Sequence, residues 1–349
     1  MYKTLLRPLL FLIDPEKIHH FIVFVVKLAN RIPGMGILLK KCFTYRHPVL
    51  TTQVAGLEFP GKVGMAAGFD KNADFYNDFS VFGFSFIEIG TVTPLSQPGN
   101  PKPRLFRLPA DRALINRMGF NNKGLDHAVK QLRSSDRKVL IGGNIGKNTA
   151  TSNTHAAADY LKCFEGLYDV VDYFVVNVSC PNIKDLDKLQ DTESLGEILS
   201  AIMTARARKE QKKPVFLKIS PDLSLKHIDE TLELYRRTGL DGIVATNTTT
   251  SRTGLHTSND RIREIGSGGL SGNPLKERSL EIVRYICKQS GNSIPVIASG
   301  GILTPADAID MIDAGASLVQ VYTGFIYEGP FIVRRIDKAI AKSLSALRK

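Results

Sequence analysis

The chain has 349 residues, 43% of them hydrophobic, with 29 glycines and 17 prolines, an ordinary composition for a folded protein that allows one large barrel or two smaller domains. Its four cysteines, at positions 42, 163, 180 and 287, are too widely separated for a zinc-finger spacing or a disulfide framework, so a reducing compartment is expected. The first residues lack the pattern of a secretory signal, and none is expected.

The net charge of +12 is unevenly distributed along the chain. The first 50 residues contain eight lysines and arginines against two acidic residues, so they carry a net charge of +6, half of the total. Such an excess suits either a nucleic acid or an anionic membrane surface. Because the excess lies in an apolar segment, we expect the membrane surface to be the partner and expect no nucleic acid.

Two apolar clusters follow one another in this basic segment, before and after Asp14. Asp14 is a typical helix N-cap, Pro15 suits the first helical position, and Pro33 with Gly34 would end the second helix. The longest uncharged apolar run has six residues, far fewer than the ~20 of a spanning helix. We therefore expect residues 1–46 to form an arm of two short amphipathic helices in a membrane interface. The alternative is a helical hairpin packed on its own domain.

From residue 47 onward, short apolar runs alternate with longer mixed segments. A hairpin is predicted over Gln53–Phe59, and helices are predicted between later strands, for example Leu195–Ala207 and His227–Thr238. Eight strand–helix units predict a (β/α)8 TIM barrel, an α/β fold, for residues 47–349. An open doubly wound sheet is the alternative, although no Gly-x-Gly-x-x-Gly follows an early strand. The expected strands are Val63–Ala66, Phe86–Ile89, Val139–Asn144, Tyr173–Val178, Val215–Ile219, Gly242–Thr246, Pro295–Ala298 and Leu318–Tyr322.

Each predicted strand is followed by polar or glycine-rich residues. In a parallel barrel these strand ends meet at one mouth, where such barrels keep their chemistry. The loops Ser299–Gly301 and Tyr322–Gly324, after strands seven and eight, suit a phosphate bound by backbone N–H groups, and Gly268–Gly272 could add donors. Any single glycine here would be an ordinary turn, but together they predict a phosphate site.

The residue types at these strand ends exclude several chemistries. The sequence has no His, Asp and Glu cluster at metal-ligand spacing, no Ser-His-Asp order and no pair of carboxylates at the strand ends, so no metal is expected. Lysine, asparagine and threonine around a phosphate loop suit a planar, amide-rich cofactor. FMN fits, because it brings one phosphate and a ring whose reduced form is anionic. Lys218 would stabilise that charge, and Lys71 would bind a substrate carboxylate.

The strand over residues 173–178 runs into the most polar of these ends, Ser179-Cys180-Pro181-Asn182. Cys180 allows three interpretations: an inert small residue, a nucleophile or a general base. A nucleophilic cysteine normally has a neighbouring histidine or helix terminus, and no histidine is close in sequence. Transfer of a proton to or from carbon is therefore favoured.

Six linked motifs follow one another along the chain: AGFDK at 67–71, EIGTVT at 88–93, KPRLFR at 102–107, INRMGFNN at 115–122, NVSCPN at 177–182 and ATNTT at 245–249. Together they resemble the dihydroorotate dehydrogenase family over nearly the whole chain. The arm is similar to that of its membrane-associated, quinone-dependent class 2. The resemblance implies FMN-dependent oxidation of (S)-dihydroorotate to orotate with a quinone as acceptor, in de novo pyrimidine (UMP) biosynthesis. It also implies a peripheral membrane protein at the cytoplasmic face of the cell membrane.

The same resemblance assigns residues to three ligands and makes Cys180 the catalytic base that removes the C5 proton. FMN would be held by Ala67, Gly68, Thr91, Asn144, Asn177, Lys218, Thr246, Gly272, Gly301, Tyr322 and Thr323. Dihydroorotate and orotate would be held by Lys71, Asn116, Arg117, Met118, Gly119, Phe120, Asn177, Asn182, Asn247 and Thr248. The quinone tunnel would be lined by His19, Arg107 and Tyr322.

Cys180 departs from the class 2 pattern, which usually has serine at this position, whereas cysteine is typical of the soluble class 1. A class 1-type enzyme with a soluble acceptor is therefore one alternative. A second is an RNA dihydrouridine synthase, a flavin barrel that also places a cysteine before a proline. A third is a non-enzymatic membrane-binding module, which would not need polar residues at so many strand ends.

Overall fold

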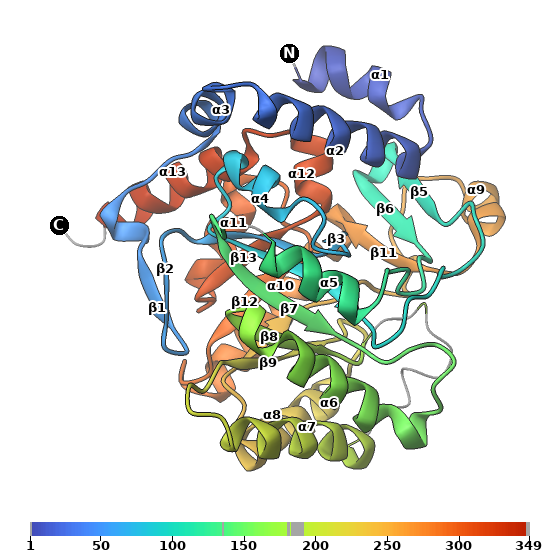
Figure 1. The fold of residues 1–349 in the computed structure, drawn as a ribbon. Helices are drawn as coiled ribbons and strands as arrows, with labels where there is room; N and C mark the ends of the chain where they lie inside the picture. The colour runs from blue at the N-terminus through green and yellow to red at the C-terminus, as the bar shows by residue number, and fades with distance from the viewer. Residues whose placement is uncertain (1, 135, 180–181, 183–191, 347–349) are drawn as a thin grey trace.

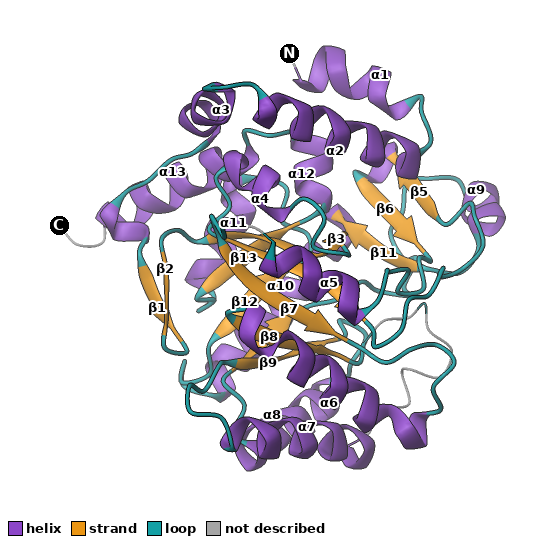
Figure 2. Ribbon diagram, viewed as in Figure 1, coloured by secondary structure: helices purple, strands orange, loops and turns teal. Residues whose placement is uncertain are grey.

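Eight parallel strands form a closed barrel at the centre of the molecule (Figures 1 and 2). The computed structural model describes residues 2–134, 136–179, 182 and 192–346. Each barrel strand pairs with the next along the chain, and the last pairs with the first through Val319 and Val63. The predicted TIM barrel is thus confirmed, and the open-sheet alternative is wrong. The strands are β3 (Val63–Asp70), β4 (Phe86–Val92), β7 (Leu140–Ile145), β8 (Tyr173–Asn177), β9 (Val215–Ile219), β10 (Gly242–Ala245), β12 (Val296–Ser299) and β13 (Leu318–Val321).

Helices surround the barrel, and several of them begin or end at residues suited to those positions. The hydroxyl of Ser224 accepts the first-turn N–H of His227, and Gly239 ends the same helix with a left-handed φ of 72°. Thr304 and Asp307 form a reciprocal capping box on another helix. The helices are α4 (Tyr76–Phe79), α5 (Leu125–Arg133), α6 (Ala156–Leu167), α7 (Thr192–Ala207), α8 (Leu225–Thr238), α9 (Asn259–Ile265), α10 (Lys276–Gln289), α11 (Pro305–Asp313), α12 (Thr323–Glu328) and α13 (Ile332–Ala346).

The barrel interior changes from apolar to polar along the strands. Towards their amino ends, Phe86, Phe216 and Val244 pack with Val54 and Phe59 of the predicted hairpin, formed by β1 (Thr52–Val54) and β2 (Leu57–Phe59). Because side chains alternate with a period of two, the residue two positions further along each strand also faces inward. Six of these next inward positions are polar: Glu88, Asn177, Lys218, Thr246, Ser299 and Gln320.

A small antiparallel sheet beside the barrel mouth was not predicted. It consists of β5 (Leu105–Leu108), β6 (Ala113–Asn116) and β11 (Gly269–Gly272), and the register pairs Asn116 with Gly269. The Gly-Leu-Ser-Gly sequence of β11 has little β-propensity, and its partner strand is more than 150 residues away in the chain. The sheet brings Asn116 and Gly272, which were predicted to bind substrate and FMN respectively, to the cavity at the mouth.

The N-terminal segment forms three α-helices, α1 (Arg7–Phe11), α2 (Pro15–Arg31) and α3 (Met35–Phe43), after a short π-helix over Tyr2–Leu6. Asp14 caps α2 as predicted, because its carboxylate accepts the backbone N–H groups of Glu16 and Lys17. The third helix, α3, was not predicted. Figure 1 shows α1 and α2 lying along one side of the barrel, close to β5 and β6.

One face of these helices packs on the barrel, and the other exposes large apolar side chains. Glu16 and Val26 of α2 are buried, whereas Leu12 and Ile37 are 83% and 77% exposed and Phe24 is 62% exposed. Among the described residues, no single helix has the length and hydropathy to cross a membrane. The pair α2 and α3, bent by 118° at the break between them, meets these criteria only when counted together.

Candidate active site

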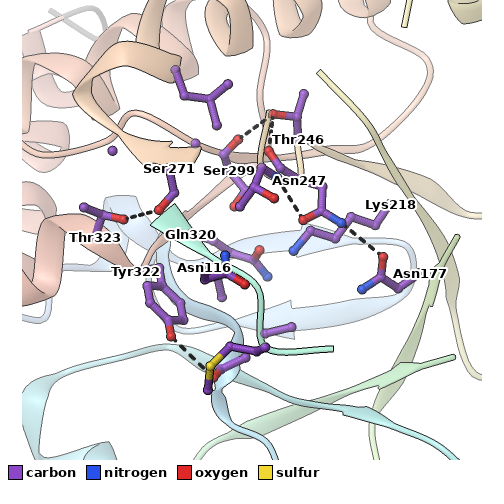
Figure 3. A pocket seen from close by; sticks show the side chains of 18 of the residues that line it. Asn116, Asn177, Lys218, Thr246, Asn247, Ser271, Ser299, Gln320, Tyr322 and Thr323 are labelled. Atoms are coloured by element: carbon purple, nitrogen blue, oxygen red, sulfur yellow. Dashed lines mark hydrogen bonds between the residues drawn. The ribbon is translucent and has the colours of Figure 1, made fainter. Parts of the chain in front are cut away.

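A cavity opens at the carboxyl ends of the barrel strands, and polar side chains from most of them point into it (Figure 3). Its empty space, including the part open to solvent, is about 1020 Å³. The predicted residues that line it are Ala67, Gly68, Lys71, Thr91, Asn116, Met118, Gly119, Phe120, Asn177, Asn182, Lys218, Thr246, Asn247, Thr248, Gly272, Gly301, Tyr322 and Thr323.

Glycine backbone forms one end of this cavity. Gly301 has a φ of +75°, and a Cβ there would lie 2.2 Å from the Cα of Lys276. Gly272 has a φ of +101°, and a Cβ there would lie 2.4 Å from a carbonyl oxygen. Only glycine fits these two positions. Next to them, the hydroxyls of Ser271 and Thr323 are 2.8 Å apart, so backbone N–H groups and hydroxyls gather where a phosphate could bind.

The floor of the cavity is a buried hydrogen-bond network centred on Glu88. Its two carboxylate oxygens accept the side-chain amides of Asn144, at 2.7 Å, and of Gln320, at 2.5 Å. The carbonyl oxygen of Asn144 therefore faces the other way, where it accepts the hydroxyl of Thr91 at 2.6 Å and the amide of Asn177 at 3.3 Å. An acceptor-only carboxylate thus determines which atom each of these carboxamides presents.

The hydrogen-bond directions that start at Glu88 extend through Asn177 to Asn247 and Ser179. Asn177 presents its oxygen to the amide of Asn247, at 3.1 Å, and Asn247 also donates to the hydroxyl of Ser179. Ser179 in turn donates to the carbonyl of Lys218 at 3.0 Å. Lys218 lines the cavity and is only 5% exposed. Figure 3 shows Asn177, Asn247 and Lys218 close together.

On the opposite side, Asn116 and Asn182 face each other, with the amide of Asn182 3.0 Å from the oxygen of Asn116. The ammonium of Lys71 donates to the carbonyl of Gly68 at 2.7 Å. Burial lowers the pKa of Lys71 to about 8. At neutral pH this side chain still carries a positive charge, which suits a ligand carboxylate.

The three residues predicted for a quinone tunnel lie where the arm meets the barrel: His19 is on α2 of the arm, Arg107 is on β5, and Tyr322 lines the cavity. The His19 ring packs edge-on against the Phe69 ring, with 4.9 Å between the ring centroids. Tyr322 also packs against the Phe69 ring, with a centroid distance of 5.4 Å. Burial lowers the pKa of His19 to about 3, so the imidazole is neutral. Arg107 donates to the carbonyls of Leu10 and Ile13 in the arm.

Among the described residues predicted to bind FMN or substrate, two do not line the cavity. Asn144 lies one layer below it, in the floor network. The side chain of Arg117 turns away to the carbonyls of Ile265 and Ser267, so its predicted direct contact with substrate has no support here. Cys180, the predicted base, lies outside the described residues.

Gln320 lines the cavity but was not among the site residues predicted from the sequence. Its Oε1 is buried without a hydrogen-bond partner. The alternation of side chains along a strand could have predicted this position, because Gln320 is two residues beyond the inward-facing Leu318 on the last barrel strand. Ser299 follows Ile297 in the same way and also lines the cavity.

Comparison with known proteins gives consistent matches. A family model described as dihydroorotate dehydrogenase matches residues 49–344. A protein from Christiangramia forsetii named dihydroorotate dehydrogenase (quinone) is 50% identical over 97% of this chain and 98% of its own length. One of the same name from Nocardia farcinica is 47% identical, over 99% and 93%. A crystal structure of DHODH from Eimeria tenella in complex with ferulenol has a TM-score of 0.84 and 36% identity, covering 96% of this chain and 92% of that chain.

Proposed function

The chain belongs to the dihydroorotate dehydrogenase family, and we propose that it oxidises dihydroorotate to orotate with bound FMN and a membrane quinone as acceptor. The observation that carries the proposal is the single cavity that combines a glycine cradle, a buried lysine and a wall of carboxamides. The family places this reaction in the biosynthesis of pyrimidines.

The residues present fit FMN. Gly272 and Gly301 line the cavity with bare backbone, and Thr323 lies beside them, so backbone N–H groups and a hydroxyl are available to a phosphate. The unpartnered oxygen of Gln320 provides a buried acceptor for a ring N–H, of the kind that an isoalloxazine carries. The remaining FMN contacts proposed from the family pattern are Ala67, Gly68, Thr91, Asn177, Lys218, Thr246 and Tyr322. Asn144, also predicted for FMN, is proposed to act from below by orienting Thr91 and Asn177.

When bound, FMN supplies the chemistry of hydride acceptance and of electron transfer to a quinone. The protein supplies charge and orientation. The Lys218 ammonium, held in a buried position, stabilises negative charge in the ring system that it faces. Asn177, whose oxygen and nitrogen are assigned by the network below, lies where it can contact both cofactor and pyrimidine.

The pyrimidine is proposed to lie between two pairs of carboxamides. Asn116 and Asn182 on one side and Asn177 and Asn247 on the other offer both donors and acceptors, as a ring with alternating C=O and N–H groups requires. The charge of Lys71 would hold its carboxylate. Thr248, Met118, Gly119 and Phe120 complete the proposed contacts.

Cys180 is proposed to remove the C5 proton. It follows the described Ser179 directly, at the end of the strand that carries Asn177. We expect Cys180→Ser to keep measurable activity and Cys180→Ala to lose most flavin reduction, because serine retains a group that can take a proton. Stopped-flow absorbance after mixing with dihydroorotate measures this step without any quinone. Near-normal single-turnover reduction in the alanine variant would contradict the assignment.

The identity of the electron acceptor is tested with purified wild-type protein that carries its yellow flavin. Dihydroorotate is the common substrate, and quinones, fumarate and NAD are offered in turn. We expect fast turnover with a quinone alone, since His19, Arg107 and Tyr322 are proposed to line its route where the arm meets the cavity. Turnover with fumarate or NAD at a comparable rate would support the class 1 alternative that Cys180 raises.

We further propose that residues 1–46 act as the membrane arm of a barrel domain formed by residues 47–349. The arm would bind the cytoplasmic face of the cell membrane peripherally. Its basic charge and exposed apolar side chains support binding to anionic lipid. Phe24→Asp on α2 should reduce sedimentation with anionic vesicles, whereas Leu225→Asp, at an exposed apolar position on α8, should not. Equal sedimentation of both variants with the wild type would contradict the proposal.

A further inference from the structure

A buried ion pair joins the arm to the wall of the pyrimidine site. We propose that Glu16 and Arg104 are positioning residues, which couple the seating of the arm on the barrel to the affinity of the site for its pyrimidine ligand. The inference rests on the proposed function, because it assumes that the wall formed by Asn116–Phe120 and Asn182 binds that ligand.

The geometry of the pair is well suited to transmit a displacement. The Nε of Arg104 lies 3.2 Å from each carboxylate oxygen of Glu16, and its Nη2 lies 3.0 Å from Oε1. The exposed fractions of the two side chains are 8% and 10%. Removing Glu16 leaves the Arg104 charge buried without its carboxylate partner, and removing Arg104 leaves Glu16 with only the more distant Lys102, at 3.9 Å. Displacing either group alone is therefore unfavourable.

Arg104 uses its remaining nitrogen on the loop that precedes it. Its Nη1 donates to the carbonyls of Pro98, at 2.7 Å, and of Asn100, at 2.9 Å. A guanidinium presents its donors in a rigid plane. The position of Glu16 therefore determines where residues 98–100 lie.

Asn100 connects that loop to the pyrimidine wall. Its backbone N–H donates to the carbonyl of Met118 at 3.1 Å. Its side-chain amide donates to the carbonyls of Arg117, at 3.0 Å, and of Asn182, at 3.2 Å. Contact is close, since a Cβ on Gly119 would lie 2.8 Å from the Asn100 side chain. One asparagine thus holds both of the segments that carry the paired Asn116 and Asn182.

A second, electrostatic link runs in parallel. Burial has the largest effect on the pKa of Lys71 and lowers it, but the charge of Glu16 raises this pKa and that of Arg104 lowers it. Lys71 lines the same cavity. Loss of the Glu16 carboxylate would therefore weaken the positive charge available to a ligand carboxylate as well as loosen the wall.

The test uses the full-length holoenzyme and orotate, with binding followed by the flavin absorbance and no quinone present. Glu16→Gln and Arg104→Gln should each weaken orotate binding at least about fivefold, the lower end of typical coupling between sites. The double variant should be little worse than either single one, because both remove the same link. Lys3→Gln is the matched control, since it removes another ion pair between arm and barrel, Lys3 with Glu328, that does not reach the wall.

A reciprocal measurement covers the case in which these variants fold poorly. Coupling by binding free energy works in both directions, so orotate should slow amide hydrogen exchange in α2 of the wild-type protein. Wild-type orotate affinity in Glu16→Gln, or a loss no greater than that in Lys3→Gln, would overturn the inference, as would unchanged exchange in α2. If the wild-type holoenzyme itself does not bind orotate, the proposed function fails instead.

Discussion

The floor of the cavity and the wall that faces the arm are both polar, but they are held in different ways. The floor consists of side chains on barrel strands, and Glu88, Asn144 and Gln320 are each no more than 1% exposed. The wall consists of loops and a three-stranded sheet, joined through Asn100 and Arg104 to a helix with an exposed apolar face. From this difference we expect the proposed cofactor side of the site to depend mainly on the barrel, and the proposed pyrimidine side to depend also on the arm.

Changes on the barrel side should therefore reduce cofactor binding, and the largest effect is expected at Gly301. In Gly301→Ala the left-handed backbone alone costs about 1–2 kcal/mol, and the added Cβ must displace the backbone of Lys276, which it would approach to 2.2 Å. We expect FMN affinity to fall at least about a hundredfold, measured as flavin bound per protein during dialysis.

Gly239→Ala is the matched control for this change. Gly239 has a similar φ of +72°, but a Cβ there meets nothing within 4 Å. The variant should lose some stability and keep its flavin. Loss of FMN in both variants would mean that backbone strain alone, rather than the cradle, explains the effect.

A smaller effect is expected in the floor, from Glu88→Gln. The substitution places an amide N–H₂ against the N–H₂ of either Asn144 or Gln320, so one buried hydrogen bond is lost or one carboxamide must turn. We expect unfolding by urea to require about 1–3 kcal/mol less free energy, together with a shifted flavin spectrum. Glu58→Gln, which changes an exposed carboxylate bonded to Gln53, should alter neither. An unchanged flavin spectrum in Glu88→Gln would show that the orientation of these carboxamides does not reach the cofactor.

The smallest effect is expected on the pyrimidine side, as a dependence on pH. Because the pKa of Lys71 is lowered to about 8, its ammonium is present below that pH and lost above it. Orotate affinity should therefore fall about tenfold between pH 7 and pH 9. In Lys71→Arg the charge persists over this range, so the variant should bind more weakly overall but lose the dependence. The same decline in both proteins would assign the titration to another group.

The sequence was sufficient to predict the barrel, because eight apolar runs of β-formers separated by longer mixed segments have few other solutions. The gathering of most proposed cofactor residues was also predictable, since strand ends of a parallel barrel necessarily meet. Gln320 was missed although the period-two alternation pointed to it. Arg117, by contrast, lay within a family motif, and only its contacts with Ile265 and Ser267 revealed that it turns away from the cavity.

The identity and order of the inward-facing residues were thus determined by the sequence alone, since local alternation along a strand needs no knowledge of distant contacts. What only the tertiary structure decided were contacts between segments far apart in the chain. The pairing of Gly269–Gly272 with Ala113–Asn116 and the ion pair of Glu16 with Arg104, 88 residues away, leave no periodic pattern in the sequence. Their partners are selected by the shape and charge of surfaces that exist only after the barrel has closed.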